Sequence, residues 1–220
     1  MSKIAVIFPG IGYHTDKPLL YYSGKLAAAA GYEIIKISYP KYDVNLKQAT
    51  KEQLATFVKM CLEATTETLK DAGLGDAEDV LFISKSIGTV VAAAYAKGID
   101  ADATHAGADV THAGADITHA GAGTTHAGAD TTCAGTVIRQ VYFTPLEETF
   151  DYVKKGVGIA FNGTKDNWAD YKKVQKLAAE YDIPLTTIED ANHSLETGDA
   201  VKDIQNLEKV ILKLVEEEII

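Results

Sequence analysis

Ser86 stands where an apolar run gives way to an alanine-rich stretch of helical composition. The run Val80–Ile83 is followed by Ser84–Gly88, in which Ser86 is the central residue. A nucleophilic serine at a strand-to-helix turn needs small residues two positions before and after it, because the turn is tight. Ser84 and Gly88 meet this requirement, so the pattern predicts a nucleophile at Ser86. The alternative is that Ser86 only caps the following helix.

A serine nucleophile requires a histidine as base and an acid to orient it, and the chain offers few candidates. Four of the six histidines lie in a repeated tract, which leaves His14 and His193 in the rest of the sequence. His193 follows the last predicted strand, and Asp166 follows the strand before it. These strand ends meet at one sheet edge, and the chain order is serine, acid, histidine. The catalytic prediction is therefore Ser86, Asp166 and His193.

Other readings of these residues stay open at the level of sequence. Asp170 and Asp190 lie close enough in the chain to compete with Asp166 for the acid position. Asp166 itself could serve only as a turn residue or a helix cap, and His193 could be an ordinary surface histidine.

A glycine-containing loop, Pro9–His14, follows the first predicted strand. Its Gly10-x-Gly12 spacing is shared with dinucleotide-binding turns, but Thr15 occupies the place of the third glycine. The second strand also lacks the acidic residue at its end that such sites use for the ribose. The sequence therefore disfavours a dinucleotide site and leaves a plain strand-to-helix turn as the structural alternative.

Short β-branched runs alternate with longer segments of helical period, which is typical of a parallel sheet flanked by helices. The predicted strands are Ile4–Phe8, Glu33–Ser38, Val80–Ser84, Gln140–Phe143, Gly156–Asn162 and Pro184–Thr187, and the predicted helices span about 17–30, 51–73, 87–97, 168–181 and 202–217. Thr50 is the expected cap of the second helix, and Cys61 is expected in its buried face. The predicted fold is an α/β class, three-layer α/β/α sandwich with a mainly parallel six-stranded sheet.

One segment does not follow this alternation. From about Thr104 to Thr136 the chain repeats Thr-His-Ala-Gly-Ala-Asp-Val and near copies with a period of seven, and Cys133 takes the place of the fifth histidine. The spacing is unlike that of a zinc site, and the repeats are too poor in apolar residues for a coiled coil. We therefore predict one domain over residues 1–220, interrupted by a low-complexity insertion at about 101–136. A metal-binding or interaction role for the repeat remains the alternative.

Composition excludes some partners. The 220 residues carry a formal charge of −10, which disfavours nucleic acid and anionic membrane surfaces. No apolar run approaches the roughly 20 residues of a membrane span. Pro9 and Gly10 end the first apolar run without a cleavage site, so it reads as a strand and not as a signal peptide. Two cysteines make no disulfide framework, and a cytoplasmic location is expected.

The elbow Ser84–Thr89, the Gly163–Asp166 turn and the Ala191–His193 loop together resemble the nucleophile, acid and base segments of the α/β-hydrolase superfamily. The chain is similar to a compact member of that superfamily over nearly everything but the repeat. Ser84 departs from the usual pattern, which has glycine at that place. The resemblance implies an oxyanion hole built from the backbone N–H of Ile87 and a second one from Ile11 or Gly12.

The same resemblance implies a serine esterase or thioesterase type of activity on a small acyl substrate, with no metal and no cofactor. The connection 144–152 is too short for a cap domain, so the site should be open, with Tyr13, His14, Leu146 and Trp168 as candidate pocket residues and Phe150 as a further wall. The alternative is a non-catalytic scaffold of the same fold that binds a ligand or partner. Oligomeric state is not predicted.

Overall fold

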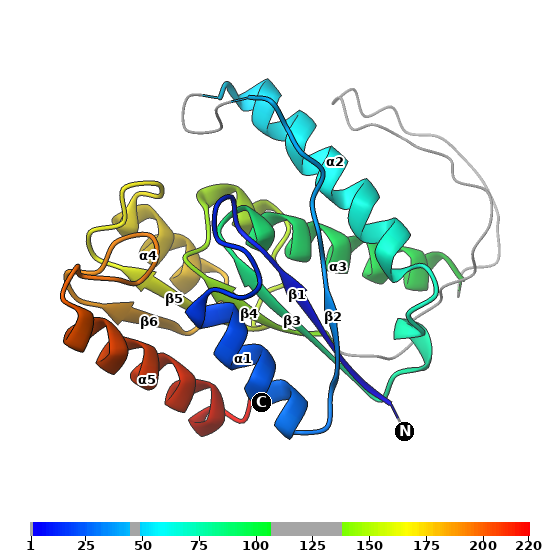
Figure 1. Cartoon of the computed structure of the whole chain (residues 1–220). Coiled ribbons are helices and arrows are strands. Elements are labelled where there is room, and N and C mark those ends of the chain that lie inside the picture. The colour runs from blue at the N-terminus through cyan, green and yellow to red at the C-terminus, as the bar shows by residue number, and fades with distance from the viewer. Residues whose placement is uncertain (1, 45–48, 107–137) are drawn as a thin grey trace.

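The computed structural model describes residues 2–44, 49–106 and 138–220. Most of the predicted insertion, with His112, His119, His126 and Cys133, lies outside the described residues, so the predictions made for it stay predictions. Figure 1 shows the described part as a central sheet with helices on both faces.

Six strands form one sheet in the order β2-β1-β3-β4-β5-β6, and every neighbouring pair is parallel. The strands are β1 (Lys3–Phe8), β2 (Glu33–Lys36), β3 (Asp79–Lys85), β4 (Ile138–Phe143), β5 (Ile159–Gly163) and β6 (Leu185–Ile188). The predicted fold class is confirmed, and the sheet is parallel throughout. Because strand order reverses between β1 and β3, the ends of the central strands open toward a common crevice, where ligands bind in open α/β sheets.

Within the described residues, four α-helices connect strands, a fifth follows β6, and two short 3₁₀ helices lie in the connections. They are α1 (Pro18–Ala29), α2 (Lys51–Leu69), α3 (Ile87–Ala106), α4 (Tyr171–Glu180), α5 (Ala200–Glu216), η1 (Leu74–Asp76) and η2 (Glu147–Asp151). Thr50 forms the expected capping box with Gln53 at the start of α2. Among these described helices, none has both the length and the apolar composition needed to cross a membrane.

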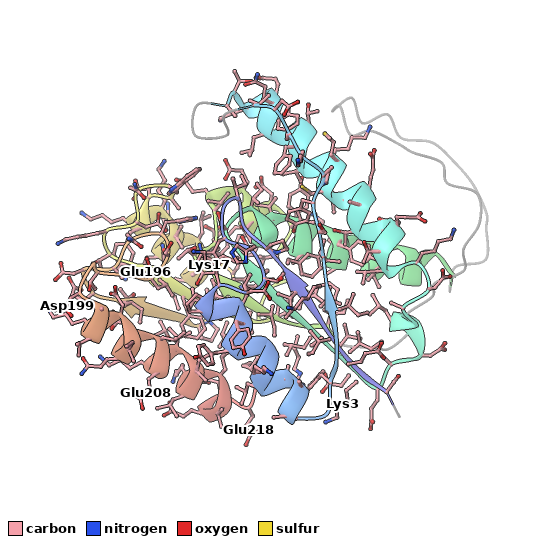
Figure 2. The ribbon with its side chains drawn as sticks, viewed as in Figure 1. Lys3, Lys17, Glu196, Asp199, Glu208 and Glu218 are labelled. Atoms are coloured by element: carbon pink, nitrogen blue, oxygen red, sulfur yellow. The ribbon has the colours of Figure 1, made fainter. Side chains whose placement is uncertain are left out.

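The sheet separates two apolar cores, because successive strand residues point to opposite faces. On one face Ile7 and Ile83 pack with residues of α1 and α5, including Leu20 and Leu214. On the other face the sheet packs against α2, α3 and α4, and Cys61 of α2 is fully buried there as expected. Figure 2 shows that the outer side of α5 carries charged side chains such as Glu208.

Several predicted boundaries differ from the structure; the third helix, for example, ends at Ala106 and not near residue 97, and two further differences have local reasons. The fifth strand begins at Ile159 and not at Gly156, because Gly156 and Gly158 have φ values of +73° and +102°, outside the extended region. The fourth helix begins at Tyr171 and not near Trp168, because the side chain of Asp170 accepts the first helical N–H groups and ends the preceding loop. The later start of α4 lengthens the loop that leaves the carboxyl end of β5.

Candidate active site

Ser86 occupies a strained turn between β3 and α3. Its φ is +55°, a value that residues with side chains adopt rarely, and its N–H donates to the carbonyl of Phe143 at 3.0 Å. Thr89, one turn into α3, donates its hydroxyl to the carbonyl of Ser86 at 2.6 Å. These contacts hold the strained backbone, so the Ser86 side chain stands at the edge of the sheet and at the start of a helix.

Small residues make this turn sterically possible. A Cβ placed on Gly88 would lie 2.4 Å from the carbonyl oxygen of Pro9, so only glycine lets α3 approach β1 this closely. Ser84 fits at the other flank because its hydroxyl donates to the carbonyl of Val141 at 2.7 Å inside the sheet. The replacement of the usual glycine by Ser84 is therefore accommodated by a hydrogen bond to the neighbouring strand.

Asp166 is held by the loop that leaves β5. A Cβ on Gly163 would lie 2.2 Å from the carbonyl oxygen of Ala191, which shows how closely the loops after β5 and β6 pack. The Asp166 side chain is fully buried, and its Oδ1 accepts the N–H groups of Trp168 at 2.8 Å and Ala169 at 3.2 Å. These two hydrogen bonds fix the orientation of the carboxylate independently of its contact with His193.

The loop after β6 is closed by its own hydrogen bonds. The side-chain oxygen of Asn192 accepts the N–H of Ser194 at 2.7 Å, and the Asn192 N–H donates to the carbonyl of Glu196 at 2.8 Å. His193 lies at the tip of this closed turn and is directed toward β3 and β5.

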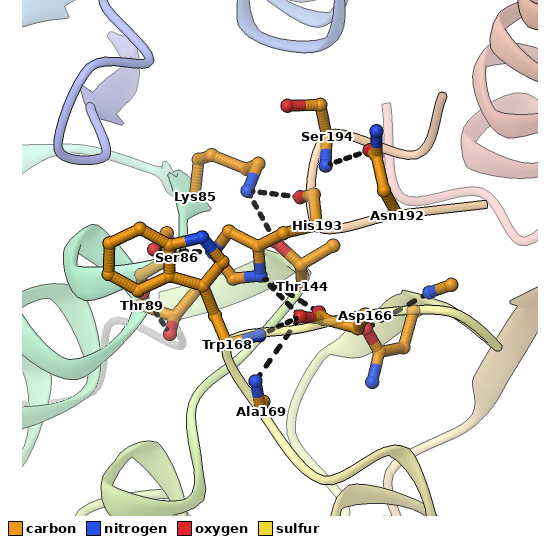
Figure 3. Close-up of polar contacts among 12 residues, drawn as sticks. Lys85, Ser86, Thr89, Thr144, Asp166, Trp168, Ala169, Asn192, His193 and Ser194 are labelled. Atoms are coloured by element: carbon orange, nitrogen blue, oxygen red, sulfur yellow. Dashed lines mark hydrogen bonds and ion pairs between the residues drawn. The ribbon is translucent and has the colours of Figure 1, made fainter. Parts of the chain in front are cut away.

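Ser86, His193 and Asp166 form a continuous hydrogen-bonded chain (Figure 3). His193 Nε2 lies 2.7 Å from Ser86 Oγ, and His193 Nδ1 lies 2.8 Å from Asp166 Oδ2 and 3.0 Å from Oδ1. The carboxylate can only accept, so Nδ1 carries the proton and Nε2 is left to accept the hydroxyl proton of Ser86. This geometry can remove a proton from the serine.

Electrostatics favour the same protonation states. Burial lowers the pKa of His193 below its ordinary value of 6.5, an effect that the hydrogen bond donated by His193 to Asp166 opposes and the charge of Lys85 reinforces. Burial alone would raise the pKa of Asp166. The contacts of that carboxylate with His193, Trp168 and Ala169 outweigh this effect and lower its pKa. At neutral pH the site therefore holds a neutral imidazole beside an ionised carboxylate.

The structure separates Asp166 from its two competitors. Asp170 caps α4, where its side chain accepts the N–H groups of Lys172 and Lys173. Asp190 is exposed and forms an ion pair with Lys165 at 2.7 Å. Neither carboxylate contacts His193.

The loop after β1 lies directly over the nucleophile. Gly10 and Tyr13 pair through two backbone hydrogen bonds, and Gly12 has a φ of +70° in the turn between them. A Cβ on Gly10 would lie 3.1 Å from Ser86 Cβ, which measures the closeness of the two segments. In the described part of the chain, the N–H groups of Ile11 and Gly12 have no intramolecular acceptor.

Ile87 supplies the other expected donor. It is the first residue of α3, its side chain is fully buried, and its N–H also lacks an acceptor among the described residues. The first N–H groups of a helix carry partial positive charge and attract anions. The donors expected for an oxyanion thus come from both sides of Ser86.

A cavity of about 230 Å³ lies above this chain. Its lining consists of Ile11, Gly12, Tyr13, Lys85, Ser86, Asn167, Trp168, Asn192, His193 and Ser194. Two predicted pocket residues, Tyr13 and Trp168, belong to it, and the Trp168 ring stacks on the His193 ring with centroids 5.6 Å apart.

Other predicted wall residues are elsewhere. Leu146 is buried in the core on the α3 face together with Phe150, because η2 turns back onto the helices. His14 is exposed and points to Asp16, since the turn before it directs only residues 11–13 toward Ser86. Leu146, Phe150 and His14 are therefore not among the lining residues of this cavity.

The sequence reasoning missed Lys85, Asn167, Asn192 and Ser194 as lining residues. Of these four residues, Lys85 had a signal in the sequence, because it is a charged residue at the end of an apolar strand, and that strand is expected to be buried. Within the described residues, no group of three or more His, Cys, Asp or Glu side chains is arranged to hold a metal ion.

Comparisons with known proteins bear on the fold. No protein-family model matches the sequence, and no curated protein matches it. Solved structures do match. An alpha-beta serine hydrolase homologue from Coxiella burnetii has a TM-score of 0.57 and 12% identity, over 97% of this chain and 85% of that one. The chain has the α/β-hydrolase fold.

Two further structures with this α/β-hydrolase fold agree. Esterase 2 of Thermogutta terrifontis, phosphorylated by paraoxon, has a TM-score of 0.55 and 16% identity over 98% of this chain and 82% of that one. A putative hydrolase of the alpha/beta superfamily from Xanthomonas campestris pv. campestris has a TM-score of 0.56 and 10% identity, over 98% of this chain and 99% of that one. In the α/β-hydrolase fold, a strained serine between a strand and a helix is the usual nucleophile position.

Proposed function

We propose that this protein is a serine hydrolase that cleaves a small ester or related acyl substrate through an acyl-enzyme. The observation that carries the proposal is the chain of hydrogen bonds from Ser86 Oγ through His193 to Asp166, at 2.7 and 2.8 Å, beneath an open cavity. Nucleophile, base and orienting acid within these distances are the requirement for covalent acyl transfer.

The reaction follows from the geometry. His193 Nε2 takes the hydroxyl proton of Ser86 while Oγ attacks the carbonyl carbon, which forms a tetrahedral oxyanion. The protonated imidazole then gives its proton to the leaving oxygen or sulfur, and the carbon–heteroatom bond breaks to leave an acyl ester on Ser86. Water, activated by the same nitrogen, hydrolyses this ester and restores the serine. Asp166 keeps the imidazole in the required tautomer throughout.

The oxyanion is stabilised by backbone donors. In this proposal the donors are the N–H of Ile87 and that of Ile11 or Gly12, which have no acceptor among the described residues, and each such donor contributes roughly 3 kcal/mol to the barrier reduction in serine hydrolases. The glycine at position 12 allows the positive φ of the turn that presents these groups.

Substrate size follows from the cavity. A volume of about 230 Å³ is below the roughly 300–1,000 Å³ of drug-sized ligand pockets, so we propose a short acyl group. Trp168 and Ile11 at the rim remain 38% exposed, and the connection 144–152 holds only the short helix η2, so the cavity opens directly to solvent.

An organophosphate tests the proposal without knowledge of the substrate. The esterase 2 structure named above was phosphorylated by paraoxon, and paraoxon should likewise modify this chain. We expect one diethylphosphoryl group on the Ser86 peptide by mass spectrometry, lost in Ser86→Ala and retained in Ser194→Ala, whose serine lines the same cavity but is not hydrogen-bonded to the His193 ring. Hydrolysis of p-nitrophenyl acetate should show the same pattern and exceed that of long-chain esters.

One outcome would contradict the proposal that this protein is a serine hydrolase. A folded protein, verified by circular dichroism, that gives neither an adduct on Ser86 nor ester hydrolysis would be a non-catalytic scaffold of this fold.

A further inference from the structure

Lys85, the residue before the nucleophile, is buried with only 1% of its surface exposed. It ends β3 and continues the row of Leu81 and Ile83, which faces the core on the α1 and α5 side. A charged side chain at the end of an apolar row is unusual, because burying an ammonium group costs free energy that an apolar side chain would not.

The ammonium group of Lys85 connects the segments that carry the site. Its Nζ donates to the main-chain carbonyl of His193 at 2.7 Å and to the hydroxyl of Thr144, the residue after β4 (Figure 3). Thr144 is itself strained, with a φ of +45°, and its N–H is bonded to the carbonyl of Phe161 at 2.8 Å. The lysine thus ties the base loop to a rigid position in the sheet.

On its remaining side the ammonium group faces the Tyr13 ring, with Nζ 5.1 Å from the ring centroid. Tyr13 lines the cavity, and its hydroxyl accepts the N–H of Leu19 near the start of α1. The loop over the nucleophile therefore rests on the same cation. Four segments, from β1, β3, β4 and β6, meet at one side chain.

The pKa of Lys85 depends on its burial and on the charged and titratable side chains near it. Burial lowers the pKa of Lys85 to about 7, and the carboxylates of Asp166 and Glu196 oppose that shift. The positive charge in turn lowers the pKa of His193, in addition to the effect of burial. Tyr13 is the remaining titratable neighbour, and its own pKa is raised to about 12, so it stays neutral.

We infer that Lys85 is a positioning residue for His193: it fixes the main-chain carbonyl of the base, and its positive charge disfavours protonation of the resting imidazole. The inference rests on the proposed function for its kinetic consequence only. Lys85 lines the cavity, but its Nζ is hydrogen-bonded to the main-chain carbonyl of His193 and to the Thr144 hydroxyl, and not to Ser86 Oγ or the imidazole ring.

The first experiment measures the imidazole directly. The ring Cε1–H signal of His193, assigned by its absence in His193→Gln, is titrated by NMR in the unaltered chain and in Lys85→Met. We expect the His193 pKa to rise by about half a unit or more without the neighbouring charge. Lys85→Arg, which keeps the charge, should retain the low value, and Lys155→Met, an exposed control, should have no effect. An unchanged His193 pKa in folded Lys85→Met overturns the inference.

A second measurement requires no variant and so avoids any failure of Lys85→Met to fold. In the unaltered chain the Lys85 Cε–H signal should titrate near pH 7, and the His193 ring signal should show a second inflection at the same pH. Loss of the Lys85 proton without any response of the His193 ring signal, at whatever pH Lys85 titrates, contradicts the inference.

Kinetics provide the third readout where ester hydrolysis is present. Because Lys85 acts through the backbone of the base, Lys85→Met should lower kcat about tenfold and leave KM within about twofold. A change in KM alone would mean that Lys85 contacts substrate instead. Both NMR titrations are made without substrate, so they test the inference even if the chain proves inactive. A failure of the proposed function can therefore be distinguished from a failure of the inference.

Discussion

Single residues at the carboxyl edge of the sheet are held in place by different contacts. Asp166 accepts two backbone N–H groups as well as the imidazole, so its position does not depend on His193. Ser86 and Lys85 are adjacent in sequence and both line the cavity, but Ser86 Oγ contacts His193 Nε2, whereas Lys85 Nζ contacts the main-chain carbonyl of His193.

Asp166→Asn should remove the charge and leave the shape. The amide no longer selects the imidazole tautomer that presents an unprotonated Nε2, so we expect kcat for ester hydrolysis to fall by about 10⁴-fold with little change in folding. Steady-state kinetics and the rate of paraoxon labelling measure the effect. Asp190→Asn is the matched control and should keep nearly full activity, because Asp190 pairs with exposed Lys165. Equal losses in both variants would argue against Asp166 as the orienting acid.

At the scale of elements, the site depends on close approaches between backbones. Gly88 brings α3 against the end of β1, and Gly163 brings the loop after β5 against the loop after β6. These contacts set the distances among segments that are far apart in the chain. Helix α2, by contrast, is capped at its start and packs in one of the two cores, and it contributes no residue to the lining of the cavity.

Gly88→Ala should disturb the elbow. Its Cβ would meet the carbonyl oxygens of Pro9 at 2.4 Å and Phe8 at 2.6 Å, and both are backbone atoms that cannot rotate away. We expect a loss of roughly 1–3 kcal/mol in unfolding free energy by urea denaturation, and slower labelling of Ser86. Gly98→Ala in the same helix is the control, since no atom lies within 4 Å of its added Cβ. That variant should be slightly stabilised, by up to about 1 kcal/mol.

At the scale of the whole molecule, the polar side chains at the two edges of the sheet have different roles. At the amino edge, Arg139 of β4 pairs with Asp79 of β3, contacts Tyr32, and donates to the carbonyls of Glu218 and Ile219, which ties the end of the chain to the sheet. At the carboxyl edge, charge is buried at a cost in stability. Lys85 is the main instance, because burial lowers the pKa of its ammonium group to about 7.

That cost predicts a pH dependence of folding. The pKa of Lys85 is about 7 when folded and about 10.4 when unfolded, so the unfolded chain binds more protons between these values and stability rises with pH there. From pH 7 to pH 9 the unfolding free energy of the unaltered chain should gain about 2 kcal/mol relative to Lys85→Met. Urea denaturation of both proteins measures this, and the difference cancels other titrating groups such as Cys61. A pH-independent difference would mean that Lys85 titrates normally.

The sequence alone determined the class of fold and the chain order of the reactive residues. Alternation of apolar runs with helical segments is a local property, and the requirement for small residues at Ser84 and Gly88 follows from the tightness of one turn. The scarcity of histidine outside the repeat left His193 as the candidate base. These features need no knowledge of distant contacts.

Only the tertiary structure decided which aspartate faces His193, which loop residues line the cavity, and where Lys85 points. Asp166, Asp170 and Asp190 are alike in sequence context, and the choice among them arises from a cap on α4, an ion pair with Lys165 and the packing of Gly163 on Ala191. Leu146 and His14 lie outside the cavity lining for the same reason. Side-chain direction in loops depends on contacts between segments far apart in the chain, and Ser86 gains its base and orienting acid only where such segments meet.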